Sequence, residues 1–420
     1  MNVSVKADRF GGSISAIPSK SYAHRMLICA ALSKKTSRLE CSSLSEDIEA
    51  TADCLNSLGA DIRYQNGIFD IHPINRDHLK DDAVIDCRES GSTLRFLLPV
   101  VCALGISCEI IMRGRLPERP LSPMYEELIS HGIKMSPQGT QPFFVDGKLD
   151  NPSFTIAANV SSQFISGLLF ALPLIGGGQI QLTGEIQSGS YIDITVECMK
   201  RAGISVSYMN QCFTVSGDYC APSYSVVQGD WSNAAFWLCA GTISNAPITV
   251  SGLDMYSAQG DKKIVDVIKR FGGHVEHDTQ EVTVFPSELK AIILDASDIP
   301  DLVPIVSVLA VHADGNTVIE HAERLRLKES DRIASVCQML QRLGVSVEER
   351  NGGMIIYGQG KCSGGEIDSW NDHRIAMTAA VFSLLSDDMI TIRSAECVRK
   401  SYPDFYKDFK SLGGTVEEIS

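Results

Sequence analysis

An internal repeat of about 70 residues runs through the chain and restricts its possible folds more than any other feature. Apolar residues at helical spacing end in a glycine six times, and consecutive glycines lie 73, 71, 69, 72 and 69 residues apart. Six repeats of this length account for all 420 residues. Such regularity indicates one supersecondary unit copied along the chain. The six glycines are Gly59, Gly132, Gly203, Gly272, Gly344 and Gly413.

Each repeat carries the pattern of two helices and several short strands. The repeat glycine fits the position just after a helix, where a left-handed backbone conformation favours glycine. Hairpins are predicted around Asn66-Gly67 and Asn351-Gly352. We therefore predict an α/β protein of six copies, with three copies in each of two similar domains. A second series of helices is expected to start near Lys20, Gly91, Ser162, Trp231, Pro300 and Asp372.

Composition excludes several classes of protein. The net charge of −14, from 37 basic and 51 acidic residues, argues against a nucleic-acid partner. Thirteen scattered cysteines without a C-x-x-C pair predict reduced thiols in the cytoplasm rather than disulfides or a zinc site. The first ten residues carry no apolar run, and the longest nearly uncharged stretch, residues 96–112, contains a proline and a glutamate, so neither a signal peptide nor a membrane span is expected. No P-loop motif is present.

Serines, lysines and arginines gather where helices are expected to begin. Helix N-termini offer unpaired N–H groups and a positive dipole end, which bind phosphates and carboxylates. Arg25, Arg95, Arg332 and Arg374 lie close to such starts, where the dipole disfavours a cation, so we expect an external anion to compensate them. Five aspartates nine to thirteen residues before a repeat glycine are expected to cap helices: Asp47, Asp193, Asp261, Asp331 and Asp404.

Nine segments resemble motifs of the EPSP synthase family, the 3-phosphoshikimate 1-carboxyvinyltransferases. In order, from about residue 10 to 406, they read SKSYAHR, SGSTLR, LPERP, SSQF, SYIDIT, IPD, LKESDR, NDHR and KSYPDF. The resemblance implies the inside-out α/β barrel of the enolpyruvyl transferase type, with three βαβαββ units in each of two domains. It implies a lower domain of residues 1–18 and 227–420, an upper domain of residues 19–226, and an active site in the cleft between them.

The resemblance also implies the reaction. The family transfers the enolpyruvyl group of phosphoenolpyruvate to the 5-hydroxyl of shikimate 3-phosphate in the shikimate pathway. A tetrahedral ketal phosphate forms and then releases phosphate, and no metal or organic cofactor takes part. A cytoplasmic monomer is expected. Glyphosate is expected to inhibit at the phosphoenolpyruvate site, with Gly91 at the wall of that site.

The family's site residues can be carried over motif by motif. Asp301 would be the base on the 5-hydroxyl, Glu329 or Lys20 would protonate the methylene carbon, and His373 would lie close to the reacting centre. Lys20 and Arg25 are expected to project into a charged cleft rather than into a core. The residues implied for shikimate 3-phosphate are Lys20, Ser21, Arg25, Ser161, Ser162, Gln163, Ser188, Asp301 and Lys328. Those implied for phosphoenolpyruvate are Lys20, Gly91, Arg119, Gln163, Arg332, Arg374 and Lys400.

Simpler roles remain open for several of these residues. Asp301 could be only a helix cap, and Glu329 could form an ordinary i,i+3 ion pair with Arg332. His274 and His277 have the spacing of metal ligands, but a third ligand is missing and no metal is expected. Arg113 and Arg115 are expected to be solvated loop charges. Trp231, Phe236 and Trp237 are expected to pack in the core.

Two rival functions are considered. The UDP-N-acetylglucosamine enolpyruvyl transferases share the fold and usually carry a reactive cysteine in the loop equivalent to residues 114–120, but this chain has no thiol there. A non-catalytic anion-binding protein of the same fold would have lost Lys20, Asp301 and Glu329, and all three are present. One departure from the family concerns Arg324, which stands where some members have a substrate-binding asparagine.

Overall fold

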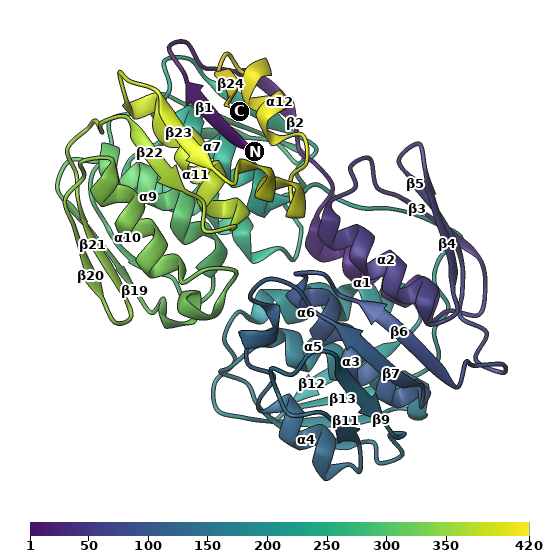
Figure 1. The fold of residues 1–420 in the computed structure, drawn as a ribbon. Coiled ribbons are helices and arrows are strands. Elements are labelled where there is room, and N and C mark those ends of the chain that lie inside the picture. Colours follow the sequence, from purple (N-terminus) through teal and green to yellow (C-terminus); the bar gives the residue numbers. More distant parts are fainter. Residues whose placement is uncertain (420) are drawn as a thin grey trace. The chain divides into compact units, whose positions relative to one another are not determined.

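The computed structural model describes residues 1–419, and the chain divides into two compact units. The terminal unit combines residues 1–19 with residues 228–420, and the inserted unit comprises residues 20–227. Strands β1 (Asn2–Lys6) and β24 (Thr415–Ile419) pair in antiparallel fashion. The two ends of the described chain therefore lie side by side within the terminal unit (Figure 1).

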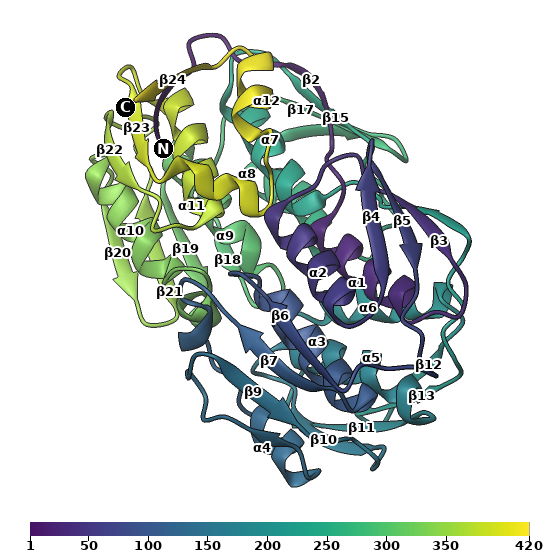
Figure 2. The ribbon, with the colours of Figure 1, turned by 45° about the vertical axis from the view of Figure 1, so that its right-hand side comes forward.

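The inserted unit is built from three repeats of the βαβαββ type. In the first repeat the hairpin β4–β5 stands beside α1 and α2 (Figure 2). That repeat consists of β14 (Tyr224–Val226), α1 (Lys20–Ala31), β3 (Ser37–Glu40), α2 (Glu46–Ser57), β4 (Asp61–Gln65) and β5 (Ile68–His72). The second consists of β6 (Asp82–Asp86), α3 (Gly91–Leu104), β7 (Ser107–Ile111), α4 (Met124–Ser130), β8 (Lys134–Met135) and β9 (Phe143–Asp146). The third consists of β10 (Ser153–Ala157), α5 (Ser162–Ala171), β11 (Gly178–Thr183), α6 (Gly189–Arg201), β12 (Ser205–Met209) and β13 (Cys212–Ser216).

The terminal unit repeats the same plan three times. Its first repeat consists of β2 (Gly12–Ser15), α7 (Trp231–Ile243), β15 (Ile248–Ser251), α8 (Ile264–Phe271), β16 (His274–His277) and β17 (Glu281–Phe285). Its second consists of β18 (Ile293–Asp295), α9 (Val303–His312), β19 (Asn316–Glu320), α10 (Arg332–Arg342), β20 (Val347–Arg350) and β21 (Gly353–Tyr357). Its third consists of β22 (Gly365–Asp368), α11 (His373–Phe382), β23 (Ile390–Arg393), α12 (Phe405–Ser411), β24 and β1.

All six sheets share one strand order, which confirms the six-copy prediction. In each sheet the first strand of the repeat pairs parallel with the second, the second pairs antiparallel with the fourth, and the fourth with the third. Three repeats take one strand from a distant part of the chain. β14 joins the first repeat of the inserted unit, β2 joins the first repeat of the terminal unit, and β1 completes the last sheet.

The six repeat glycines have the left-handed conformation that the sequence predicts. Their φ angles lie between +72° and +110°, and each follows directly on the second helix of its repeat or its last turn. The predicted hairpins are also present, because β4 and β5 flank Asn66-Gly67 and β20 and β21 flank Asn351-Gly352. Local turn chemistry therefore determines where each repeat changes from helix to strand.

The first helix of each repeat lies in the core. In the terminal unit, nearly every residue of α7, α9 and α11 is buried, and α9 packs against both α7 and α11. A helix that is buried on all sides must be internal, so the sheets cover these three helices. Trp231, Phe236 and Trp237 belong to this core, as expected. The polar starts of the central helices are consequently held in fixed places by apolar packing.

The second helix of each repeat buries only one face. None of the helices within residues 1–419 is long and apolar enough to cross a membrane. All thirteen cysteines are free thiols and ten of them are buried. Burial raises the pKa of the Cys108 and Cys198 thiols to about 12.

Candidate active site

Asp301 is the centre of a charged cluster in the terminal unit. It lies in a 3-10 turn, Pro300–Leu302, directly before α9. Its carboxylate accepts from Lys328 Nζ at 3.2 Å, Arg332 Nη1 at 2.8 Å and Arg374 Nη2 at 3.3 Å. Three cations from separate elements therefore converge on one carboxylate, which is far more than a helix cap would require.

Arg332 joins Asp301 to two further carboxylates. This side chain is 2% exposed, and it donates from Nε to Asp372 and from Nη2 to Glu329, each at 2.8 Å. Burial alone would lower the pKa of Arg332, but Asp372, Glu329 and Asp301 outweigh burial and raise it. The protein's own carboxylates therefore compensate Arg332 in this structure, and the binding of an external anion to Arg332 stays a prediction. The i,i+3 ion pair of Glu329 with Arg332 is present.

The start of α11 supplies the rest of this cluster. Asp372 caps the helix by accepting from Arg374 N at 2.9 Å, and His373, its first residue, is 2% exposed. Lys400 is 6% exposed and donates from Nζ to the carbonyl of Asn371 at 2.7 Å. Asn371 has a φ of +55°, a left-handed conformation that asparagine adopts more readily than most other non-glycine residues.

Lys328 lies between Asp301 and α11 in the sequence, just before α10. Burial lowers the pKa of Lys328, and the nearby Asp301 carboxylate only partly opposes this effect. Arg324 lies in the preceding 3-10 segment, Glu323–Leu327. The terminal unit thus brings together Asp301, Lys328, Glu329, Arg332, His373, Arg374 and Lys400 from the predicted site.

In the inserted unit, the start of α1 carries Lys20 and Arg25. Lys20 Nζ forms an ion pair with Asp47 of α2 at 2.8 Å. Arg25 is only 2% exposed, packs over the Phe96 ring at 4.7 Å, and donates from Nε to Thr195 Oγ1 at 2.7 Å. Burial lowers the pKa of Arg25 to about 10. The expectation that Arg25 projects away from the core is therefore wrong.

Arg25 holds two backbone segments of the predicted phosphate site. Its Nη1 donates to the carbonyl of Ser21 at 2.7 Å, and its Nη2 donates to the carbonyl of Tyr191 at 2.9 Å. Ser188, three residues before Tyr191, is 2% exposed and has a φ of +54°. Ser161 caps α5 by accepting from Gln163 N at 3.3 Å, and Ser162 is 4% exposed.

A second group in this unit surrounds Gly91 at the start of α3. Gln163 links α5 to α3, because its Nε2 donates to Ser92 Oγ and its Oε1 accepts from Arg95 Nη1, both at 2.9 Å. A Cβ atom on Gly91 would lie 2.7 Å from Arg119 Nη1 and 2.9 Å from Arg95 Nη1. The absence of a side chain at Gly91 thus allows two guanidinium groups to approach the helix start.

Of the five aspartates expected to cap helices, the structure bears out one. Asp331 is the N-cap of α10 and accepts from Ala334 N at 3.1 Å. Asp47 instead pairs with Lys20, and Asp404 occupies an N-cap position without a side-chain bond. Asp193 lies inside α6, and Asp261 lies buried in a 3-10 turn. For Asp47, the ion pair with Lys20 of another helix takes the place of a capping bond.

Several residues outside the cluster have the ordinary roles considered above. Arg113 pairs with Asp86, and Arg115 pairs with Glu118 at 3.5 Å, both on the surface. His274 and His277 lie on the exposed strand β16. Within residues 1–419, His, Cys, Asp and Glu side chains form no group of three or more that could hold a metal ion.

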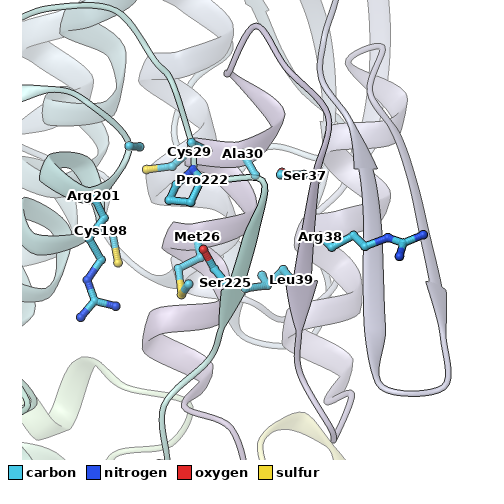
Figure 3. A pocket seen from close by; sticks show the side chains of 12 residues that line it. Met26, Cys29, Ala30, Ser37, Arg38, Leu39, Cys198, Arg201, Pro222 and Ser225 are labelled. Atoms are coloured by element: carbon cyan, nitrogen blue, oxygen red, sulfur yellow. The ribbon is translucent and has the colours of Figure 1, made fainter.

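A separate hollow lies one helical turn along α1 and α6 from the contact between Arg25 and Thr195. Its volume is about 30 Å³, and Cys29, Cys198 and Arg201 are among the residues that line it (Figure 3). None of the predicted site residues lines this hollow.

Comparison with known proteins gives one consistent result. A model of the EPSP synthase family matches residues 5–409. The 3-phosphoshikimate 1-carboxyvinyltransferase of Clostridium kluyveri is 40% identical over 424 residues, which cover 100% of this chain and 99% of that protein. That of Clostridium acetobutylicum is 41% identical, with 97% of this chain and 96% of that protein covered.

Solved structures show the same fold. The EPSP synthase from Acinetobacter baumannii matches with a TM-score of 0.82 at 23% identity, over 99% of this chain and 100% of that chain. The enolpyruvyl transferase NikO from Streptomyces tendae matches with a TM-score of 0.76 at 17% identity, over 100% and 98%. The predicted enolpyruvyl transferase fold is thereby confirmed. The chain belongs to the EPSP synthase (3-phosphoshikimate 1-carboxyvinyltransferase) family.

Proposed function

We propose that this chain transfers the enolpyruvyl group of phosphoenolpyruvate to the 5-hydroxyl of shikimate 3-phosphate and releases phosphate. The names of its curated relatives support this reaction. The observation that carries the proposal is the Asp301 carboxylate, held by three cations with Glu329 and His373 nearby in the same cluster. A fixed carboxylate can accept a hydroxyl proton, while the cations around it attract the phosphate and carboxylate groups of the substrates.

In this proposal Asp301 removes the proton from the 5-hydroxyl as the oxygen attacks the vinyl carbon. Lys328, Arg332 and Arg374 hold and orient the Asp301 carboxylate through charge-assisted bonds. The attack forms the tetrahedral ketal phosphate once the methylene carbon has gained a proton. Loss of that proton and departure of phosphate then restore the double bond. Arg119, Arg374 and Lys400 would bind phosphoenolpyruvate and stabilise the departing phosphate.

Two groups compete for the role of the acid at the methylene carbon. Glu329 is paired with Arg332, and Lys20 is paired with Asp47. An ammonium group such as that of Lys20 has protons to donate, whereas the Glu329 carboxylate accepts from Arg332. Glu329 could donate only after an anion on Arg332 weakens that pair. We therefore keep both candidates, and an isotope experiment separates them in the Discussion.

The inserted unit would supply most of the contacts to shikimate 3-phosphate. Ser161, Ser162 and Ser188 would bind its phosphate, with Lys20 and Ser21 beside it, and Gln163 would contact both substrates. Arg25 would contribute mainly by fixing the carbonyls of Ser21 and Tyr191, given its burial. We propose that the clusters of the two units act on the same pair of substrates.

Phosphate release with two different acceptors tests this function. The protein is mixed with phosphoenolpyruvate and either shikimate 3-phosphate or UDP-N-acetylglucosamine, and inorganic phosphate is followed over time. We expect release only with shikimate 3-phosphate. Release only with the UDP-sugar would assign the chain to the sister reaction. Binding of shikimate 3-phosphate without release would indicate a non-catalytic anion-binding protein.

We further propose that the enzyme is a cytoplasmic monomer without a cofactor and that glyphosate inhibits it. The thirteen free cysteines are compatible with a reducing compartment. Light scattering during gel filtration tests the oligomeric state. Inhibition by glyphosate that phosphoenolpyruvate relieves would support binding at the proposed phosphoenolpyruvate site, and full activity at high glyphosate concentration would contradict it.

A further inference from the structure

A buried histidine of α1, His24, has no part in the roles described above. The residue is 1% exposed. Within residues 1–419 its Nε2 has no hydrogen-bond partner, and the ring's hydrogen bond joins Nδ1 to Thr51 Oγ1 at 2.7 Å. A buried polar group is costly unless it is bonded. The contact with Thr51 is therefore what a histidine adds at this place over an apolar side chain.

Three buried hydroxyl groups lead from His24 to the start of α3, and we call them the hydroxyl relay. Thr51 Oγ1, on α2, lies 2.6 Å from Thr93 Oγ1 on α3. Thr93 Oγ1 donates to Ser90 Oγ at 2.8 Å. Ser90 is the N-cap of α3, and the same oxygen accepts from Thr93 N at 3.3 Å. The relay thus connects α1 and α2 to the first turn of α3.

The count of hydrogens gives the relay a single direction. Each hydroxyl has one hydrogen to donate. The hydrogen of Thr93 goes to Ser90, so the short contact between Thr93 and Thr51 requires that Thr51 donates. The hydrogen of Thr51 is thereby used, and its contact with His24 requires a proton on Nδ1.

The surroundings of the ring select the same tautomer. Burial lowers the pKa of His24 well below its ordinary value, and the charges of Lys20 and Arg25 lower it further, so the ring is neutral. A neutral imidazole carries one N–H group. A proton on Nε2 would create a buried donor without an acceptor among residues 1–419, which is rarer in proteins than a buried acceptor without a donor.

We propose that His24 is a positioning residue for phosphoenolpyruvate, which fixes the start of α3 through the hydroxyl relay. Gly91 directly follows Ser90, and the guanidinium groups of Arg95 and Arg119 lie against it. A displaced helix start would move this wall relative to the two guanidinium groups. The inference rests on the proposed function, which assigns Gly91 and Arg119 to phosphoenolpyruvate.

Variants of the relay test this role by kinetics. Thr51→Val removes the hydroxyl but keeps the shape of the side chain. We expect KM for phosphoenolpyruvate to rise roughly 2- to 12-fold, as for the loss of one hydrogen bond, with the dissociation constant of shikimate 3-phosphate unchanged. His24→Leu should have a similar effect. The double variant should be no worse than either single variant, because both changes break the same relay.

Conservative variants separate the relay from simple packing. Thr51→Ser keeps a hydroxyl, and His24→Asn keeps an N–H donor at the place of Nδ1, so both should restore KM for phosphoenolpyruvate. The matched control is Thr317→Val, the same change at a buried threonine of β19 whose hydroxyl has no hydrogen-bond partner within residues 1–419. It should leave KM unchanged. Circular dichroism confirms that each variant is folded before its kinetics are interpreted.

Nuclear magnetic resonance of protein labelled with ¹⁵N-histidine observes the tautomer itself. The signals of His24 are those lost in His24→Asn, and we expect a proton on Nδ1. A bare Nδ1 would overturn the inference. So would an active wild type whose KM for phosphoenolpyruvate stays the same in folded Thr51→Val, while the proposed function would remain intact. A wild type without activity on phosphoenolpyruvate and shikimate 3-phosphate would instead overturn the proposed function, and the positioning role with it.

Discussion

Replacement of Arg332 by methionine is expected to destabilise the terminal unit strongly. Arg332 is almost completely buried and holds three carboxylates, those of Asp301, Glu329 and Asp372. A methionine of similar length would fill the space but leave these carboxylates without their common cation. Removing one partner of a buried ion pair costs about 3–5 kcal/mol, because the remaining charge stays desolvated.

The size of the effect can be worked out for thermal unfolding. In a unit of about 200 residues, 1 kcal/mol changes Tm by about 2–4 °C. Arg332→Met should therefore lower the Tm of the terminal unit by roughly 6–20 °C. Arg332→Lys keeps the charge, but a single ammonium group cannot reach three carboxylates in the geometry of a guanidinium. We expect an intermediate loss for this variant.

Calorimetry and chemical denaturation at two pH values provide the assay. The matched control is Arg350→Met, which removes a half-exposed arginine paired with Glu348 at 3.0 Å and should cost at most about 1 kcal/mol. Carboxylates without a cation take up protons more readily, so the deficit of Arg332→Met should shrink from pH 8 to pH 5. A loss below about 1 kcal/mol, or a deficit that does not depend on pH, would refute the view that Arg332 stabilises by compensating these charges.

Three further predictions concern the inserted unit and the proton donor. Arg25→Ala should lower kcat/KM roughly 10- to 150-fold and the free energy of unfolding by about 1.5–3 kcal/mol, because it removes the bonds to Thr195, Ser21 and Tyr191; an unchanged denaturation midpoint would contradict this. Gly91→Ala should raise the glyphosate inhibition constant roughly 5- to 150-fold and KM for phosphoenolpyruvate to a smaller extent, since the added methyl displaces Arg119 and Arg95; an equal rise in both constants would count against the wall assigned to Gly91. In heavy water, deuterium should enter the methylene group of phosphoenolpyruvate in the presence of shikimate 3-phosphate, and mass spectrometry of Lys20→Ala and Glu329→Gln identifies the donor as the residue whose loss abolishes incorporation.

The repeat architecture could be predicted from the sequence because local chemistry determines it. Left-handed φ angles favour glycine at the six repeat positions. The polar residues at the starts of the central helices indicate where those helices begin. The exchange of strands could not be foreseen. β14, β2 and β1 each pair with strands far away in the sequence, and short strands carry no signal for such a partner.

The same distinction between local and distant interactions decides which residues of the candidate site could be predicted. Asp301, Lys328, Glu329 and Arg374 could be identified because each lies in a short motif of neighbouring residues. The roles of Asp47 and Asp372 were missed, because their partners Lys20 and Arg332 come from other helices. The burial of Arg25 was also missed, since its position near a helix start gives no sign of the neighbouring helices that cover it.

The most direct test of the central claim compares Asp301→Asn with Asp298→Asn. Asp298 is an exposed aspartate three residues away that pairs with Lys263, so it controls for the loss of one acidic charge in the same segment. The account predicts that Asp301→Asn lowers kcat for enolpyruvyl transfer by about 10²- to 10⁴-fold. It also predicts that shikimate 3-phosphate still binds by calorimetry and that Asp298→Asn behaves like the wild type. A folded Asp301→Asn variant with the kcat of the wild type would contradict the assignment of Asp301 as the base.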